Sequence, residues 1–236
     1  MIEKDLFGKA LWDYWTDNNP EDMLTWTHLT EPEVLPIAYL FRSYDEMPVS
    51  EQLALQNSYG KILDVGAGSG LHSLYLQAQQ KDVTALEWSP ISSRLMHERG
   101  VRKVVNQNFF AFNPPERFDT ILLLMNGVGL VQKARNLDQF FIKLKQLLSE
   151  NGQAFIHSSD LKYLYETGTG YMMPDDNYYG DVHFYIKYKG ETESFDWTYI
   201  DENTLRIFAR QNGFKTEKIF ESDEGDFLIR VTSSNR

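Results

Sequence analysis

The sequence contains no cysteine among its 236 residues. Disulfide bonds, thiolate metal sites and cysteine nucleophiles are therefore excluded. Long apolar runs are missing as well: the longest, residues 121–125, is far too short to cross a bilayer. The first residues also lack the charged-then-apolar pattern of a signal peptide. We therefore expect a soluble, cytoplasmic protein that has no membrane partner.

Positive charge is scarce, because 23 basic residues face 34 acidic ones and the net charge is −11. A chain with this average field and no basic run repels a phosphate backbone, so we expect no nucleic-acid partner. No cluster of histidines and carboxylates has ligand spacing, so we also expect no metal. Hydrophobic residues make up 42% and aromatic residues 14% of the chain. This composition predicts a sizeable core and favours an aromatic-lined pocket for a small molecule.

Short apolar runs alternate with helical patterns from residue 61 onward. The alternation predicts an α/β fold with a doubly wound, mostly parallel seven-stranded sheet and helices on both faces. The last two strands are joined by a short turn, so we expect them to pair as a hairpin with an antiparallel last strand. The strands are expected at residues 61–65, 83–87, 101–105, 118–125, 153–157, 214–220 and 227–231.

Two further segments are attached to this core within a single domain, residues 1–236. Residues 1–58 are rich in aromatic residues and broken by prolines, which predicts an N-terminal helical cap on the core, residues 59–236. Apolar residues alternate near 178–200, which predicts an inserted β-hairpin. This hairpin is either the surface of a homodimer or a wall of the substrate pocket. The loop before it, residues 168–180, is expected to be mobile.

A glycine-rich turn carries the strongest functional signal. Residues 62–71 read ILDVGAGSGL, so Gly66, Gly68 and Gly70 follow the first strand and enter a helix. Glycines there allow a sharp turn and a close approach of ligand to backbone, at the usual ligand crevice of an open α/β sheet. Glu87 ends the second strand, where a carboxylate can accept hydrogen bonds from ribose hydroxyls. The spacing G-x-G-x-G differs from the G-x-G-x-x-G of nicotinamide dinucleotide sites.

The motif DVGAGSG, Glu87 after the second strand and seven strands ending in a hairpin resemble the class I S-adenosylmethionine-dependent methyltransferases. The resemblance covers roughly residues 58–236. It implies a Rossmann-like fold, S-adenosyl-L-methionine as cofactor and methyl transfer as the reaction, with the glycines beside the methionyl and ribose groups. The implied cofactor-binding residues are Asp64, Gly66, Ala67, Gly68, Gly70, Glu87, Trp88, Asn108, Phe109 and Asn126.

The resemblance also implies individual roles. Asp64 would orient the glycine loop or reach the methionine amino group, and Glu87 would hold the ribose. Trp88 would stack on the adenine or, alternatively, cover the next helix. Asn108 would hydrogen-bond the adenine amino group, with its neighbour Phe109 beside it. Asn126 would lie near the methionine moiety.

Candidates for the substrate site carry weaker signals. Arg42 and Tyr44 are candidate substrate-binding residues, with Arg42 either clamping a carboxylate or forming a surface ion pair. His157 and Asp160 flank the carboxyl end of the fifth strand, where either is a candidate general base or a group that orders the loop by hydrogen bonding. The methyl acceptor itself cannot be read from these residues.

Two other functions compete with the methyltransferase. One is an NAD-dependent oxidoreductase, which the glycine spacing disfavours. The other is a non-catalytic cofactor-binding or interaction protein that uses the hairpin as a docking surface.

Overall fold

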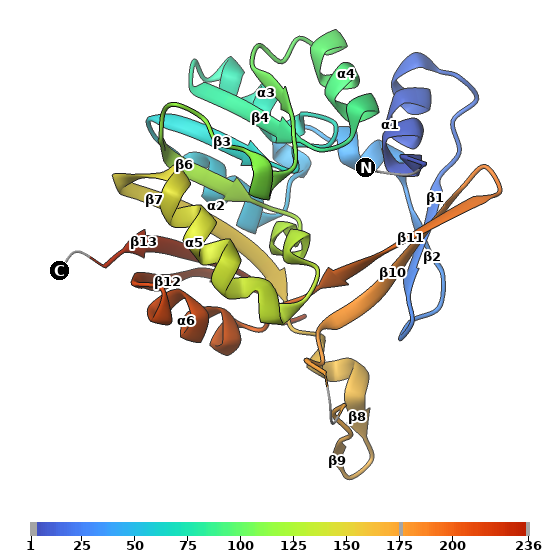
Figure 1. The fold of residues 1–236 in the computed structure, drawn as a ribbon. Helices are drawn as coiled ribbons and strands as arrows, with labels where there is room; N and C mark the ends of the chain where they lie inside the picture. Colours follow the sequence, from blue (N-terminus) through green and yellow to red (C-terminus); the bar gives the residue numbers. More distant parts are fainter. Residues whose placement is uncertain (1–3, 175–176, 235–236) are drawn as a thin grey trace.

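The computed structural model describes residues 4–174 and 177–234. Its largest sheet has seven strands in the order β12-β13-β7-β6-β3-β4-β5 (Figure 1). Neighbours on both sides of β3 run parallel to it, whereas β13 is antiparallel to both β7 and β12. The predicted doubly wound sheet with an antiparallel last strand is therefore confirmed. The strands are β3 (Lys61–Val65), β4 (Asp82–Glu87), β5 (Val104–Asn106), β6 (Phe118–Leu123), β7 (Leu148–Ser159), β12 (Phe214–Glu221) and β13 (Asp226–Ser233).

Helices cover both faces of this sheet because its central strands are apolar on both sides. Leu63 of β3 packs with α5 and α6 on one face, and its neighbour Ile62 packs with α2 and α3 on the other. Successive strand residues point to opposite faces, so a continuous apolar run fills both layers. Phe140 and Phe141 of α5 are fully buried, each contributing about 1.5–3 kcal/mol. The helices are α1 (Leu6–Thr16), α2 (Val49–Gln56), α3 (Leu71–Ala78), α4 (Pro90–Glu98), α5 (Leu137–Leu147) and α6 (Glu202–Gln211).

Some predicted strand boundaries need correction. β7 begins at Leu148, directly after α5, instead of at residue 153. Asn151 and Gly152 therefore lie inside the strand. Gly152 is required there by close packing, since a Cβ would stand 2.9 Å from the carbonyl oxygen of Phe118. β5 begins at Val104, because Val101 packs into the core beside α4 instead of joining the sheet.

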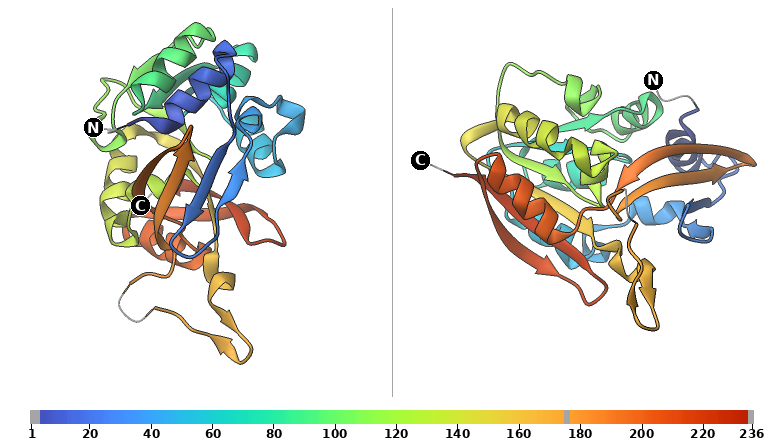
Figure 2. Two further views of the ribbon diagram at one scale, coloured as in Figure 1. Left: turned by 90° about the vertical axis from the view of Figure 1, so that its right-hand side faces the viewer. Right: turned by 60° about the horizontal axis from the view of Figure 1, so that its bottom comes forward.

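The N-terminal segment, expected to be a helical cap, also contains two strands. β1 (Met23–Thr27) and β2 (Glu33–Leu35) pair with each other. β1 also pairs with β10 (Asp181–Tyr188), which is joined to β11 (Glu191–Thr198). The result is a second sheet in the order β11-β10-β1-β2, seen in the left view of Figure 2. β-Branched and aromatic residues in β1 favour a strand, but its partner lies some 160 residues away along the chain.

The inserted hairpin is confirmed as β10 and β11 and is held by the same chain. Ile186 and Tyr188 are buried against α1, so these apolar side chains are covered without a second copy. Trp197 lies against Gly129 of the 3-10 helix η4 (Gly127–Val131), where a Cβ would stand 2.0 Å from the indole. The lack of a side chain at Gly129 thus allows Trp197 to pack the hairpin onto the core.

The segment before the hairpin projects from the lower part of Figure 1. The short strands β8 (Glu166–Thr167) and β9 (Gly170–Tyr171) pair there. Residues 175–176, part of the loop expected to be mobile, lie outside the described residues. In the described ranges, no helix has the length and apolar character needed to cross a membrane.

Candidate functional site

The glycine turn lies at the carboxyl end of β3, and all three glycines have positive φ. The angles are 69° at Gly66, 55° at Gly68 and 81° at Gly70. Open space surrounds the position of a Cβ at Gly66, as a close ligand requires. At Gly70 a Cβ would stand 2.9 Å from Met96, so packing against α4 also demands glycine there. Ala67, between them, is buried against α4.

Glu87 lies directly beside this turn. Its Oε2 accepts a hydrogen bond from the Gly68 N–H at 2.8 Å, and its Oε1 accepts one from the Ser89 N–H at 2.9 Å. Burial raises the pKa of Glu87, although the backbone hydrogen bonds oppose the shift. The tips of β3 and β4 therefore hold one carboxylate against the glycine turn. A ribose with two free hydroxyls matches this acceptor.

Asp64, in β3 just before the turn, connects this strand to the helix that follows. Its Oδ2 accepts a hydrogen bond from the Ser73 hydroxyl in α3 at 2.7 Å, and the residue is 2% exposed. Burial raises the pKa of Asp64, against the lowering effect of His72 and Ser73. This bond ties the end of β3 to the helix that follows the turn.

A buried ionic cluster next to Asp64 was missed by the sequence analysis. Arg42 Nη2 donates to both carboxylate oxygens of Glu51 at 2.5 Å, and His72 Nε2 lies 2.7 Å from Glu51 Oε2. Burial acts to raise the pKa of Glu51, but His72 and Arg42 outweigh it and hold the pKa below its ordinary value. The expected surface ion pair of Arg42 is thus a buried one, since its side chain is 3% exposed. Glu51 belongs to no motif, so only its place on α2 reveals its role.

The residues expected around the adenine have different surroundings. Trp88 is 44% exposed at the edge of the crevice. Asn108 accepts the Phe110 N–H through Oδ1 at 2.9 Å, which caps a 3-10 helix and leaves its NH2 group for a further partner. Phe109 is buried in the core with its ring 5.8 Å from that of Phe140.

The tip of β6, the strand next to β3, forms a tight turn with two positive φ angles, at Met125 and Asn126. The Asn126 N–H donates to His157 Nδ1 at 3.0 Å. Burial lowers the pKa of His157, so the ring is neutral and carries its proton on Nε2. In this state His157 orders the strand tip and has no free basic nitrogen.

Asp160 and Tyr44 are engaged in local structure. Asp160 Oδ1 accepts from the Lys162 N–H at 2.9 Å and from the Tyr179 hydroxyl at 2.7 Å, which orders the start of the hairpin segment. Tyr44 stacks on Tyr75 of α3, with ring centroids 4.2 Å apart. Its hydroxyl accepts from Gln56 at 2.6 Å.

A cavity of about 660 Å³ opens between the two sheets. Its walls come from β1, the loop after it and the start of β2, and from the end of β7, the 3-10 helix η6 (Leu161–Tyr165), β10 and the turn between β12 and β13. Ser159 in this wall lies 2.9 Å from Asn126 Oδ1 and also hydrogen-bonds Asp226. Ser159 therefore links the cavity wall to the tip of β6, the strand next to β3.

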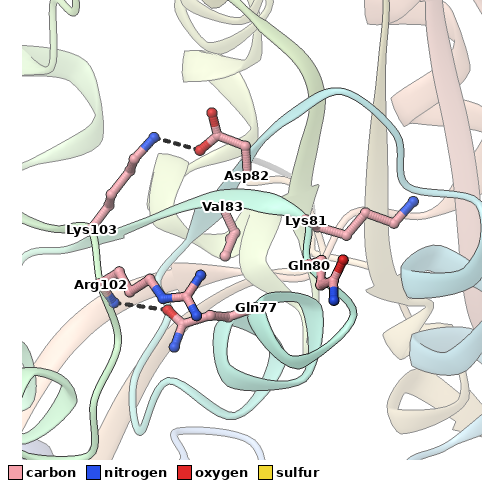
Figure 3. Close-up of a pocket in the computed structure, with 7 residues that line it drawn as sticks. All are labelled: Gln77, Gln80, Lys81, Asp82, Val83, Arg102 and Lys103. Carbon is pink, nitrogen blue, oxygen red and sulfur yellow. Dashed lines mark hydrogen bonds and ion pairs between the residues drawn. The ribbon is translucent and has the colours of Figure 1, made fainter.

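A second hollow, of about 260 Å³, lies at the amino end of β4 (Figure 3). It is lined by polar side chains such as Gln77 and Lys103. Ligands of open α/β sheets bind at the carboxyl ends of the strands, which is the opposite edge. The larger cavity is therefore the candidate for a substrate site.

The topology, the glycine turn and the adjoining carboxylate together define an S-adenosylmethionine-dependent methyltransferase. A model of the methyltransferase domain family matches residues 38–218, and the chain belongs to this family. It is also similar to the crystal structure of an S-adenosylmethionine-dependent methyltransferase from Bacteroides fragilis in complex with S-adenosyl-L-homocysteine. That chain is 40% identical with a TM-score of 0.91, and the match covers 100% of this chain and 97% of that one.

More distant solved structures share the fold. A methyltransferase from Clostridium acetobutylicum is 13% identical, with coverage of 81% and 94% and a TM-score of 0.61. The sugar N-methyltransferase KedS8 from Streptoalloteichus is 14% identical, with coverage of 79% and 85% and a TM-score of 0.54. No curated protein matches the sequence.

The cofactor is S-adenosylmethionine, because the 40% identical structure contains its product, S-adenosylhomocysteine. The residues around the glycine turn fit this group: Gly66 leaves open space, and Glu87 offers acceptors for a ribose. This finding overturns the alternative of an NAD-dependent oxidoreductase.

Proposed function

We propose that this methyltransferase modifies a small-molecule acceptor bound in the cavity between the two sheets. The observation that carries the proposal is the hydrogen-bonded link from the cavity wall, at Ser159, to Asn126 beside the glycine turn. A volume of about 660 Å³ suits a small molecule. The negative charge of the chain also supports a partner other than nucleic acid.

Cofactor binding would use the two strand tips. Glu87 would accept hydrogen bonds from the ribose, and Gly66 and Gly68 would let the methionyl and ribose groups approach the backbone. Trp88 would cover the adenine, and the free NH2 group of Asn108 would donate to a ring nitrogen. This last role differs from the expected contact with the adenine amino group, because Asn108 Oδ1 already accepts the Phe110 N–H.

The bound cofactor supplies a methyl group on a positively charged sulfur. The task of the chain is then to align an acceptor atom with the carbon–sulfur bond. Orientation of this kind contributes about 7–11 kcal/mol to lowering a barrier. Asn126, held by His157 and Ser159, would define the position of the methyl group relative to the cavity. No nucleophilic side chain is required for such a transfer.

Labelled methyl transfer to a size-fractionated cell extract tests the proposal. The protein is incubated with S-adenosylmethionine carrying a trideuterated methyl group, once with solutes below about 3 kDa and once with macromolecules. We expect the label in a low-mass product and expect Gly68→Val to abolish it. Label confined to the macromolecular fraction, or no label in either fraction, would contradict a small-molecule acceptor.

A further inference from the structure

The cavity between the two sheets carries unbalanced negative charge. Four carboxylates line it, Glu33, Asp223, Glu224 and Asp226, and its lining contains no lysine, arginine or histidine. Within residues 4–174 and 177–234, none of the four forms a salt bridge. Some carboxylates elsewhere in the chain are paired with a lysine, as Glu221 is with Lys218. Like charges gathered in a hollow without counter-charges favour a cationic ligand.

Aromatic rings complete the cavity wall. Phe184 of β10, Tyr163 of η6 and Tyr199 all line it. Burial, with smaller contributions from Tyr163 and Asp226, raises the pKa of Tyr199 to about 12, so its hydroxyl is neutral at pH 7. Aromatic faces attract cations and cover the apolar part of an organic ligand. Rings and carboxylates in one cavity therefore match an organic cation more closely than an inorganic one.

The carboxylate of Asp226 stands at the end of the cavity that is linked to the β6 tip. The Ser159 hydroxyl bonds Asp226 Oδ1 and lies 2.9 Å from Asn126 Oδ1. Asp226 is also among the charges that act on Tyr199 and His157. A cation held by Asp226 would thus stand on the side of the cavity nearest to the proposed methyl position.

We propose that the acceptor is a small organic molecule with a primary or secondary amine, methylated on nitrogen, whose ammonium form binds the carboxylates of this cavity. The inference rests on the proposed function and specifies its substrate class. Phenolates, thiolates and carboxylates are disfavoured as acceptors, because four nearby negative charges repel anions. An amine reaches the cavity as a cation and leaves it as a cation.

The reaction balances with water as the only other participant. The bound ammonium first loses one proton to solvent, and the nitrogen lone pair then attacks the methyl carbon. The carbon–sulfur bond breaks and its electron pair stays on sulfur, which becomes neutral. The nitrogen gains the methyl group and the positive charge. Charge therefore moves from the cofactor toward Asp226, and a carboxylate placed there stabilises the positive charge that develops on nitrogen as the neutral amine attacks.

Selective blocking of amines tests the inference. The low-mass extract is treated with an N-hydroxysuccinimide ester of acetic acid and then with hydroxylamine, which frees any acetylated hydroxyl groups. We expect this treatment to abolish incorporation of the labelled methyl group, and the product from untreated extract to be retained on a cation exchanger at pH 7. Undiminished incorporation after treatment, or a neutral or anionic product, would overturn the amine assignment while leaving a small-molecule acceptor in place.

Charge removal at the cavity provides the second measurement. We expect Asp226→Asn to raise the KM for the amine fraction at least tenfold, whereas the Kd for S-adenosylhomocysteine measured by calorimetry stays unchanged. Glu221→Gln is the matched control, since it removes a carboxylate outside the cavity from the same strand pair. An unchanged KM in a folded Asp226→Asn variant would also overturn the inference. Failure of the untreated extract to accept any label would instead count against the proposed function.

Discussion

Single residues at the strand tips fix the shape of the glycine turn through hydrogen bonds rather than through side-chain packing. Glu87 accepts from the backbone of Gly68, two residues after Gly66, where the space for a Cβ is open. Asp64 performs the matching task behind the turn through Ser73. Both carboxyls have raised pKa values because of burial. Raised pKa values of this kind cluster at functional sites.

Replacing Glu87 by alanine should weaken the binding of S-adenosylhomocysteine more than tenfold, which is more than about 1.4 kcal/mol. The reason is the loss of the acceptor proposed for the ribose hydroxyls. Titration calorimetry measures the change, with Glu116→Ala as a control that removes an exposed carboxylate at the other end of the sheet. An unchanged Kd in a folded Glu87→Ala protein would disprove the ribose assignment.

At the scale of elements, the inserted hairpin depends on a partner strand and a docking surface. β10 pairs along its length with β11, and its residues 184–187 pair with β1 from the N-terminal segment. Trp197 of β11 lies against Gly129 of the 3-10 helix η4. These contacts fix one wall of the cavity relative to the strand tips.

Gly129→Ala should therefore lower the free energy of unfolding by about 1–3 kcal/mol, because the added methyl group overlaps the indole of Trp197. In a Trp197→Ala background the same change should cost much less, since the overlap is gone. Urea denaturation of the four proteins gives the coupling energy. Equal costs in both backgrounds would show that Gly129 does not support the hairpin through this contact.

For the whole molecule, the two sheets line one cavity. The N-terminal segment packs on the core through α1 and forms part of the cavity wall through β1. α1 packs on α4 through Asp5, which accepts from the Ser89 hydroxyl at 2.8 Å, while β1 lines the cavity. Phe7 of α1 also lies near the glycine turn, 3.8 Å from the Cβ position of Gly68. Because this segment would contact both proposed ligands, their binding would be coupled to the stability of the whole chain.

S-Adenosylhomocysteine at about one hundred times its Kd should stabilise the protein by about 2.7 kcal/mol. For a chain of this length that corresponds to a rise in Tm of about 5–10 °C. A thermal-shift measurement checks this, with NAD at the same concentration as the control ligand. An equal rise with NAD would contradict a site selective for the sulfonium cofactor and its product.

Local patterns in the sequence were sufficient to predict the core sheet and the cofactor crevice. Short apolar runs, turn glycines and Glu87 at a strand end each depend on neighbours close in the chain, and all seven core strands were located. By itself the sequence thus determined the fold class, the position of the glycine turn and the residue facing it.

The tertiary structure alone decided the rest. The pairing of β1 with β10 and the Arg42–Glu51–His72 cluster join residues that no local pattern connects. The acidic cavity likewise collects carboxylates from β2 and from the last hairpin, nearly 200 residues apart. Periodicity reports which face of a strand is buried, whereas long-range pairing depends on how all the buried faces pack together. Only the folded chain shows which charges are left without a partner in one place.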